Sequence, residues 1–231
     1  MPLGIIFISL LFMMLGMIVQ FRLKNKFSTY SKIPTGSGLS GKEIAETMLH
    51  DNGIFDVNVI SVPGFLSDHY DPIKKTVNLS PDVYDGRNIS AAAVAAHECG
   101  HAVQHATAYS MLMVRSMLVP VVQISSNLAQ WIILIGLGLF SFGGGNQTVL
   151  LIGIILFAAS TLFAVITLPV EFDASARALK WLEASHITAP QEYEKAKDAL
   201  KWAALTYVVA ALASIALLIQ YILIYQGRSR D

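Results

Sequence analysis

The chain has 231 residues, of which 54% are hydrophobic and only 14% are charged. Soluble domains carry about 25% charged residues, so much of this surface is expected to face something other than water. The formal net charge is zero and no basic run is interleaved with aromatic residues, which removes the usual basis for binding nucleic acid. The single cysteine, Cys99, excludes an internal disulfide and a structural zinc site built from cysteines.

Four stretches of the chain are apolar over enough residues to cross a bilayer, which takes about 20 residues in a helix. They are Leu3–Phe21, Leu118–Phe142, Thr148–Leu168 and Trp202–Tyr225. The first carries no charge, and basic residues follow it instead of preceding it, so we expect an uncleaved anchor and not a signal peptide. The third is expected to end at Pro169, because proline interrupts a helix.

Four crossings would place the two polar parts of the chain on one side of the membrane and both termini on the other. All but two of the 16 lysines and arginines lie in these polar parts. Because cytoplasmic segments are enriched in basic residues, we predict that the polar parts face the cytoplasm at a bacterial plasma membrane. The expected division is an anchor (1–21), a cytoplasmic α+β segment (22–117), a transmembrane hairpin (118–168), a further helix (169–201) and a last transmembrane helix with its tail (202–231).

The polar part that follows the first crossing is predicted to begin with a helix and two strands. Ser40 precedes Glu43 by three residues, a capping-box pattern that opens a helix, and Gly53 is placed to end it. The β-branched segments Asp56–Val62 and Lys74–Ser80 are expected to form a hairpin. The second of these strands is also expected to present an edge on which an extended substrate docks.

An alanine-rich run that starts at Asn88 or Ser90 predicts a second helix, since alanine is the best helix former. It contains the pattern H-E-x-x-H, in which His97 and His101 are four residues apart and therefore lie on one face of the helix. Two imidazoles placed in this way can hold one tetrahedral zinc ion. Glu98 is rotated by about 100° from His97 and is expected to lie beside the ion as a general base.

A catalytic zinc site usually has three protein ligands and a water molecule. His105 follows His101 by four residues, but a straight helix does not easily present a third imidazole to the same ion. His105 is therefore a candidate for a place beside the ligands or on the substrate side, and a capping histidine at the helix end is the alternative. Glu171 and Asp173 follow the third apolar stretch, and the membrane topology places them on the same side as the histidines. We favour Glu171 as the third ligand, with Asp173 as the alternative. Stabilisation of a helix N-terminus would explain either acid equally well.

With the segments SGKEIAETML, GFLSDHYDP, VNLSPDVY and PVEFDASARAL, the motif resembles the neutral zinc metallopeptidase family of bacterial membrane proteins, the YugP-like group, over most of the chain. At a distance it is also similar to membrane gluzincins of the HtpX type. The resemblance implies His97, His101 and Glu171 as zinc ligands and Glu98 as the base. In many gluzincins an aspartate four residues after the ligand glutamate orients a motif histidine, and here that position is Ser175.

Four further residues are candidates for supporting roles. Asp173 is expected to take over the orienting role of the missing aspartate. In the loop sequence SDHYDP, His69 or Tyr70 is placed to donate a hydrogen bond to an oxyanion, although the same residues also fit an Asx-type turn before Pro72. Arg177 is a candidate oxyanion donor, and a structural ion pair with a carboxylate is the favoured interpretation.

We therefore predict a mainly α membrane protein with about four transmembrane helices and a small α+β zinc-metallopeptidase unit that contains the H-E-x-x-H helix. Its predicted function is Zn²⁺-dependent hydrolysis of peptide or membrane-protein substrates in a lipid bilayer, with no role for nucleic acid. The alternative is a non-proteolytic metal-binding membrane scaffold or a chaperone-like protein. The presence of Glu98 favours the enzyme, because a scaffold has no need of a base.

Overall fold

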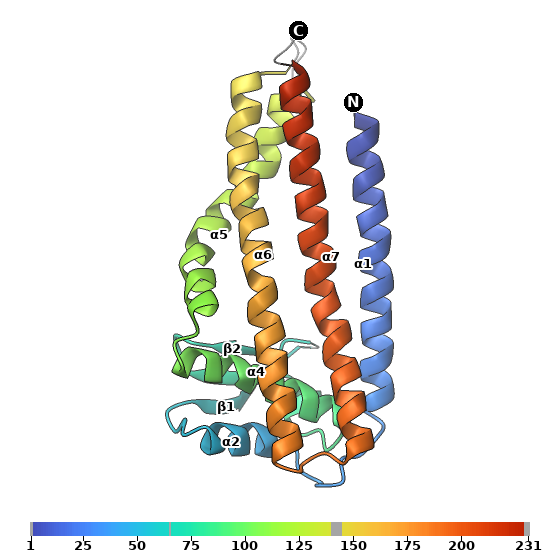
Figure 1. Cartoon of the computed structure of the whole chain (residues 1–231), viewed down its shortest axis with the longest axis vertical. Coiled ribbons are helices and arrows are strands. Elements are labelled where there is room, and N and C mark those ends of the chain that lie inside the picture. Colours follow the sequence, from blue (N-terminus) through green and yellow to red (C-terminus); the bar gives the residue numbers. More distant parts are fainter. Residues whose placement is uncertain (1, 65, 140–144, 229–231) are drawn as a thin grey trace. The chain divides into compact units, whose positions relative to one another are not determined.

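The computed structural model describes residues 2–64, 66–139 and 145–228, which are mainly helical with one small sheet (Figure 1). The helices are α1 (Pro2–Tyr30), α2 (Gly41–Asp51), α3 (Pro81–Tyr84), α4 (Ile89–Ala106), α5 (Ser110–Leu137), α6 (Gln147–Ala184) and α7 (Pro190–Arg228), and the strands are β1 (Asn58–Ser61), β2 (His69–Asp71) and β3 (Thr76–Leu79). The chain divides into two compact units. The first comprises the described residues of Met1–Ile18, Val114–Leu168 and Thr206–Asp231, and the second comprises those of Val19–Met113 and Pro169–Leu205.

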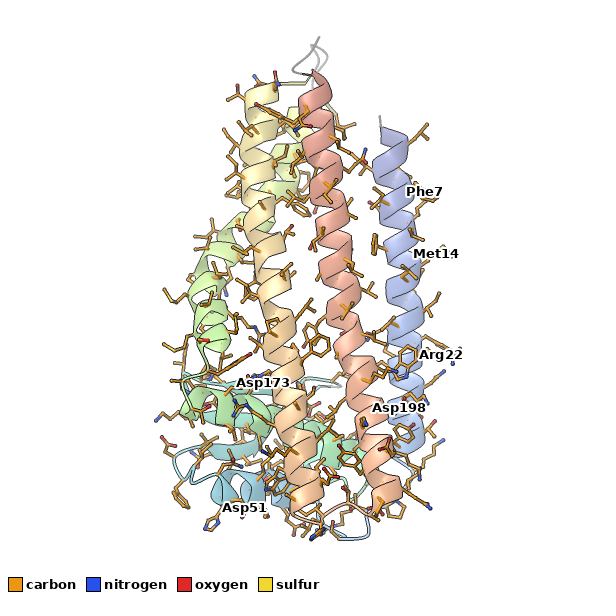
Figure 2. All side chains as sticks on the ribbon, in the orientation of Figure 1. Phe7, Met14, Arg22, Asp51, Asp173 and Asp198 are labelled. Atoms are coloured by element: carbon orange, nitrogen blue, oxygen red, sulfur yellow. The ribbon has the colours of Figure 1, made fainter. Side chains whose placement is uncertain are left out.

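The first unit is built from apolar helix segments. Within the described residues, α1, α5, α6 and α7 are each long and apolar enough to cross a membrane. Apolar side chains such as Phe7 and Met14 on α1 are exposed (Figure 2), as expected of a surface that lipid covers. At Gly136 of α5 a Cβ atom would lie 2.5 Å from the Cα of Leu150 in α6, so glycine lets these two helices approach closely. The part of the second apolar stretch from Phe140 onward lies outside the described residues.

The long helices extend beyond the apolar stretches that predicted them. α1 continues past Phe21 to Tyr30, and α7 begins at Pro190 instead of near Trp202. The helix of the third apolar stretch does not end at Pro169 as expected, because α6 continues through this proline to Ala184. Proline removes one backbone hydrogen bond, which long membrane helices tolerate when neighbouring groups compensate. The residues that follow Pro169 are therefore presented by a continuous helix.

The second unit begins its polar part as the sequence predicts. The Ser40 hydroxyl accepts a hydrogen bond from the Glu43 backbone N–H, and the Glu43 carboxylate accepts one from the Ser40 N–H, so the capping box of α2 is confirmed. Gly53 follows this helix with a φ of +71°, a conformation that glycine adopts without strain. Asn88 caps α4, since its side-chain oxygen accepts from the N–H of Ala91 at 3.0 Å.

The sheet differs from the prediction of a single hairpin. Its strand order is β1-β3-β2, with β1 parallel to β3 and β2 antiparallel to β3. The strand β2 lies in the polar sequence that was expected to be a loop, and the turn after it is held by Asp71, whose Oδ1 accepts from the N–H groups of Ile73 and Lys74. The predicted docking edge on the second strand is therefore also wrong, because β3 is paired on both sides.

The small side chains of α4 let neighbouring helices pack closely against it. Its buried alanines are Ala91, Ala92, Ala93, Ala95, Ala96 and Ala102. On one face the buried Cys99 contacts the carbonyl oxygen of Ala45 in α2 at 3.5 Å. On another face Gly100 meets the backbone of Ala174 in α6. The core of this unit therefore holds α4 between partners that fix its position.

Candidate metal centre

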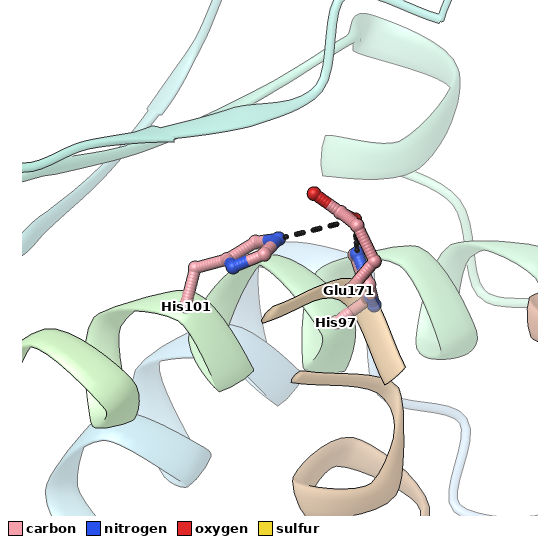
Figure 3. A group of neighbouring side chains, drawn as sticks. All are labelled: His97, His101 and Glu171. Atoms are coloured by element: carbon pink, nitrogen blue, oxygen red, sulfur yellow. Dashed lines mark ion pairs between the residues drawn. The ribbon is translucent and has the colours of Figure 1, made fainter. Parts of the chain in front are cut away.

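Three side chains that can bind a metal converge where α4 meets the C-terminal part of α6 (Figure 3). The Oε2 atom of Glu171 lies 3.3 Å from Nε2 of His97 and 3.6 Å from Nε2 of His101. Only 2% of Glu171 and 8% of His101 is exposed. A tetrahedral ion with bonds of about 2.0–2.1 Å holds its ligand atoms about 3.3–3.4 Å apart, so the observed separations fit one ion.

The close packing of the two helices brings Glu171 to the histidines. A Cβ atom at Gly100 would lie 2.5 Å from the carbonyl oxygen of Ala174, which means that α4 and α6 touch with their backbones. Ala174 follows Glu171 by three residues, so the glutamate lies about one turn away on the same face of α6. The absence of a side chain at Gly100 is thus a condition for the convergence of the three ligand atoms.

Substitution of Gly100 by alanine is expected to destabilise the protein and to weaken metal binding. Alanine would favour the helix by about 1 kcal/mol, but overpacking against a rigid backbone costs about 1–3 kcal/mol and displaces α6 with Glu171. Chemical unfolding and zinc titration of the full-length variant measure both effects. Gly16→Ala is the matched control, because nothing lies within 4 Å of a Cβ atom at Gly16. Equal stability and zinc affinity in both variants would contradict the expectation.

Each motif histidine has a hydrogen-bond partner on the nitrogen that faces away from Glu171. Nδ1 of His97 lies 3.1 Å from Oγ of Ser175, and Nδ1 of His101 lies 3.0 Å from Oε1 of Gln104. Such bonds orient metal-binding imidazoles and select the tautomer whose Nε2 can bind the ion. Ser175 occupies the position where many gluzincins carry an aspartate, and its hydroxyl contacts a motif histidine directly.

Asp173, which was expected to orient a motif histidine, contacts Gln104, and Gln104 in turn contacts His101. Oδ2 of Asp173 accepts hydrogen bonds from Nε2 of Gln104 at 2.8 Å and from Nε of Arg177 at 2.6 Å. The Arg177 guanidinium also lies over the ring of Tyr109, 5.8 Å from its centre. Arg177 therefore forms the structural ion pair that the sequence favoured. No sequence pattern indicated a role for Gln104, which joins Asp173 to His101.

The remaining candidates make their contacts elsewhere in the second unit. The Tyr70 hydroxyl and Nδ1 of His105 lie 2.9 Å apart, which joins β2 to the end of α4. His69 is exposed on β2, and its Nδ1 lies 2.7 Å from the carbonyl oxygen of Ser67. Burial raises the pKa of the Tyr70 hydroxyl, and the charges of Asp56 and Asp71 raise it further. Tyr70 consequently keeps its proton and its capacity to donate a hydrogen bond.

Two further groups on α4 have shifted pKa values. Burial raises the pKa of the Cys99 thiol well above its ordinary value, and the neighbouring Glu98 carboxylate adds to this effect. Cys99 is thus a neutral packing residue. Burial by itself would lower the pKa of His101, but the hydrogen bond to Glu171 and the charge of Glu98 outweigh it and raise the pKa.

The comparison with known proteins agrees with this chemistry. The family described as "Putative neutral zinc metallopeptidase" matches residues 5–226. The chain belongs to this family. It is also 42% identical over 227 residues to a protein of Bacillus subtilis (strain 168) described as "Putative membrane protease YugP", a match that covers 98% of this chain and 99% of that protein. No solved structure matches the chain. The resemblance that the sequence motifs indicated is thereby confirmed.

Membership of the family implies zinc, and the residues present fit this ion. Two imidazole nitrogens and one carboxylate oxygen form a donor set that is typical of zinc hydrolases. The ligand atoms of His97, His101 and Glu171 all lie within 4.8 Å of one another. Glu98, which follows the first ligand, is 92% buried in the same helix. The three candidate ligands therefore lie close to one further buried acid in the sequence.

Proposed function

We propose that this protein is a zinc-dependent endopeptidase of the membrane in which His97, His101 and Glu171 bind the ion and Glu98 is the general base. The observation that supports it most strongly is the convergence of the three ligand atoms from two helices in a member of a zinc metallopeptidase family. The ligands come from segments about 70 residues apart in the chain, so chance proximity along one helix does not explain them.

In the proposed reaction, bound zinc would polarise the scissile carbonyl and make the attacking water more acidic. The carboxylate of Glu98 takes the proton that this water loses as its oxygen adds to the carbonyl carbon. The same carboxylic acid then gives the proton to the nitrogen of the breaking C–N bond, so the amine leaves as a neutral group and Glu98 is regenerated. Burial of Glu98 keeps bulk water from competing for this proton.

We propose that the protein crosses the membrane several times and that its catalytic unit faces the cytoplasm. Four helices have the length and apolar composition of membrane spans. All but two of the 16 basic residues lie in the polar parts of the sequence, which supports a cytoplasmic position for them. Substrates would therefore be peptides or membrane proteins that present a segment on this side of the bilayer.

Removal of the metal is the experiment that tests this function. The purified full-length protein is expected to contain one zinc ion per chain and to cleave an unfolded membrane-protein substrate. A chelator should abolish cleavage, and added Zn²⁺ should restore it, because the carboxylate base has no activated water without the ion. Zinc content by atomic absorption and product formation by mass spectrometry are the measurements.

Two results would contradict the proposal in different ways. Full cleavage after complete removal of zinc would show that the reaction does not depend on the metal. Stoichiometric zinc without cleavage of any unfolded substrate would instead support a metal-binding scaffold.

A further inference from the structure

A glutamine in the core connects two of the three proposed zinc ligands. Gln104 lies on α4, three residues after His101, and its side chain is fully buried. Its amide makes three hydrogen bonds. Nε2 donates to the backbone carbonyl of Val170 at 2.7 Å and to Oδ2 of Asp173 at 2.8 Å, and Oε1 lies 3.0 Å from Nδ1 of His101. A buried polar group with all its partners present is both stabilising and specific in its geometry.

These partners fix which way the amide points. The carbonyl oxygen of Val170 and the carboxylate of Asp173 can only accept hydrogen bonds, so the group that faces them must be the NH₂ of Gln104. Asp173 is itself held by Nε of Arg177 at 2.6 Å. The oxygen of the amide therefore faces His101, because rotating the amide by 180° would lose both bonds to Val170 and Asp173.

The orientation of the amide in turn decides the proton position on the histidine. Oε1 of Gln104 can only accept, so Nδ1 of His101 must carry the hydrogen between them. In the neutral ring the lone pair is then on Nε2. Nε2 is the atom that lies 3.6 Å from the Glu171 carboxylate, so the ring offers its lone pair to the centre.

We propose that Gln104 is a positioning residue that holds His101 as its zinc-binding tautomer and, through the carbonyl of Val170, fixes the backbone directly before Glu171. One side chain would thus set the geometry of two ligands that come from different helices. The proposal rests on the proposed zinc site, but it concerns residues that do not themselves bind the ion.

Zinc titration of full-length variants separates this role from ordinary packing. Gln104→Met preserves the size of the side chain and removes all three bonds, so zinc affinity should fall by about 10–100-fold, as for other partners of metal-binding histidines. Val103→Ala is the matched control, because it removes buried volume from the neighbouring position without touching the hydrogen-bond network. It should lower the unfolding temperature and leave the zinc affinity unchanged.

Two further readouts keep the test decisive if Gln104→Met does not fold. Gln104→Glu retains an acceptor for Nδ1 of His101 but loses the donor to the carbonyl of Val170, so its zinc affinity should fall less than that of Gln104→Met, and its stability should fall as well. In the zinc-loaded protein with ¹⁵N-labelled histidine, the Nδ1–H of His101 should give a slowly exchanging NMR signal. This signal should persist in Gln104→Glu and Val103→Ala and shift in Gln104→Met.

The possible failures point to different conclusions. Wild-type zinc affinity in Gln104→Met, or a zinc-loaded wild type in which Nδ1 of His101 exchanges freely with water, would overturn the positioning role and leave the proposed function intact. Loss of zinc in Gln104→Glu to the level of Gln104→Met would also overturn it. A wild-type chain that takes up no zinc would refute the proposed function and this inference together.

Discussion

Replacement of Glu98 by glutamine is expected to leave one zinc ion per chain and to slow peptide cleavage by about 10²–10⁴-fold. The amide has the size of the carboxylate but cannot take a proton from the attacking water. The metal is retained because the proposed ligands are His97, His101 and Glu171, whose nitrogen and oxygen atoms converge without Glu98. Zinc content and the initial rate of cleavage, measured on the same preparation, test both halves of the expectation.

Glu46→Gln provides the matched control for this change. Glu46 is an exposed residue of α2 that forms an ion pair with Lys42 at 3.7 Å, and it has no contact with the centre. The same chemical substitution there should change neither the zinc content nor the rate. Wild-type cleavage by Glu98→Gln would exclude Glu98 as the base. Loss of zinc together with activity would mean that Glu98 acts on metal binding instead of proton transfer.

Replacement of Glu171 by glutamine is expected to weaken zinc binding by more than about 100-fold. Loss of a residue that only hydrogen-bonds to a ligand costs up to about 100-fold, and loss of a ligand itself should cost more. The neutral amide oxygen is a much poorer partner for Zn²⁺ than the carboxylate, and the ion would be left with two protein ligands. Since Glu171 is almost completely buried, water cannot easily take its place. Competition with a chromogenic chelator measures the affinity, and cleavage should be lost in parallel.

Asp173→Asn distinguishes the two acids that the sequence offered as the third ligand. An asparagine oxygen can still accept from Gln104 and Arg177, so this variant should retain zinc at a stoichiometry near one. Glu171→Gln should not. The reverse result, with zinc lost from Asp173→Asn and kept by Glu171→Gln, would exchange the roles of the two residues.

The parts of the protein that the sequence predicts well depend on short-range rules. Ser40 and Glu43 cap α2 because both partners of the capping box lie within one turn. His97 and His101 share a face because their spacing matches the helical repeat. The expected membrane topology places Glu171 on the side of the motif, because an even number of predicted crossings lies between them. Each of these inferences needs only local spacing or a count of apolar stretches.

The parts of the structure that differ from the sequence-based predictions depend on contacts between distant segments of the chain. The strand β2 has only three residues in a polar sequence, and its conformation is supplied by pairing with β3. Helix α6 passes through Pro169 although proline is a local signal for a helix end. Gln104 and Ser175 gain their roles from partners on another helix. A single sequence gives no pattern for such pairs, so these residues become visible only in three dimensions.

The buried position of Cys99 has a practical consequence. It is the only thiol of the chain, it is completely enclosed, and it packs against α2 directly beside the proposed base. An alkylating reagent can reach it only when α4 separates from its neighbours. The rate of alkylation of the unmodified chain therefore reports how often the core around α4 opens, without any introduced label.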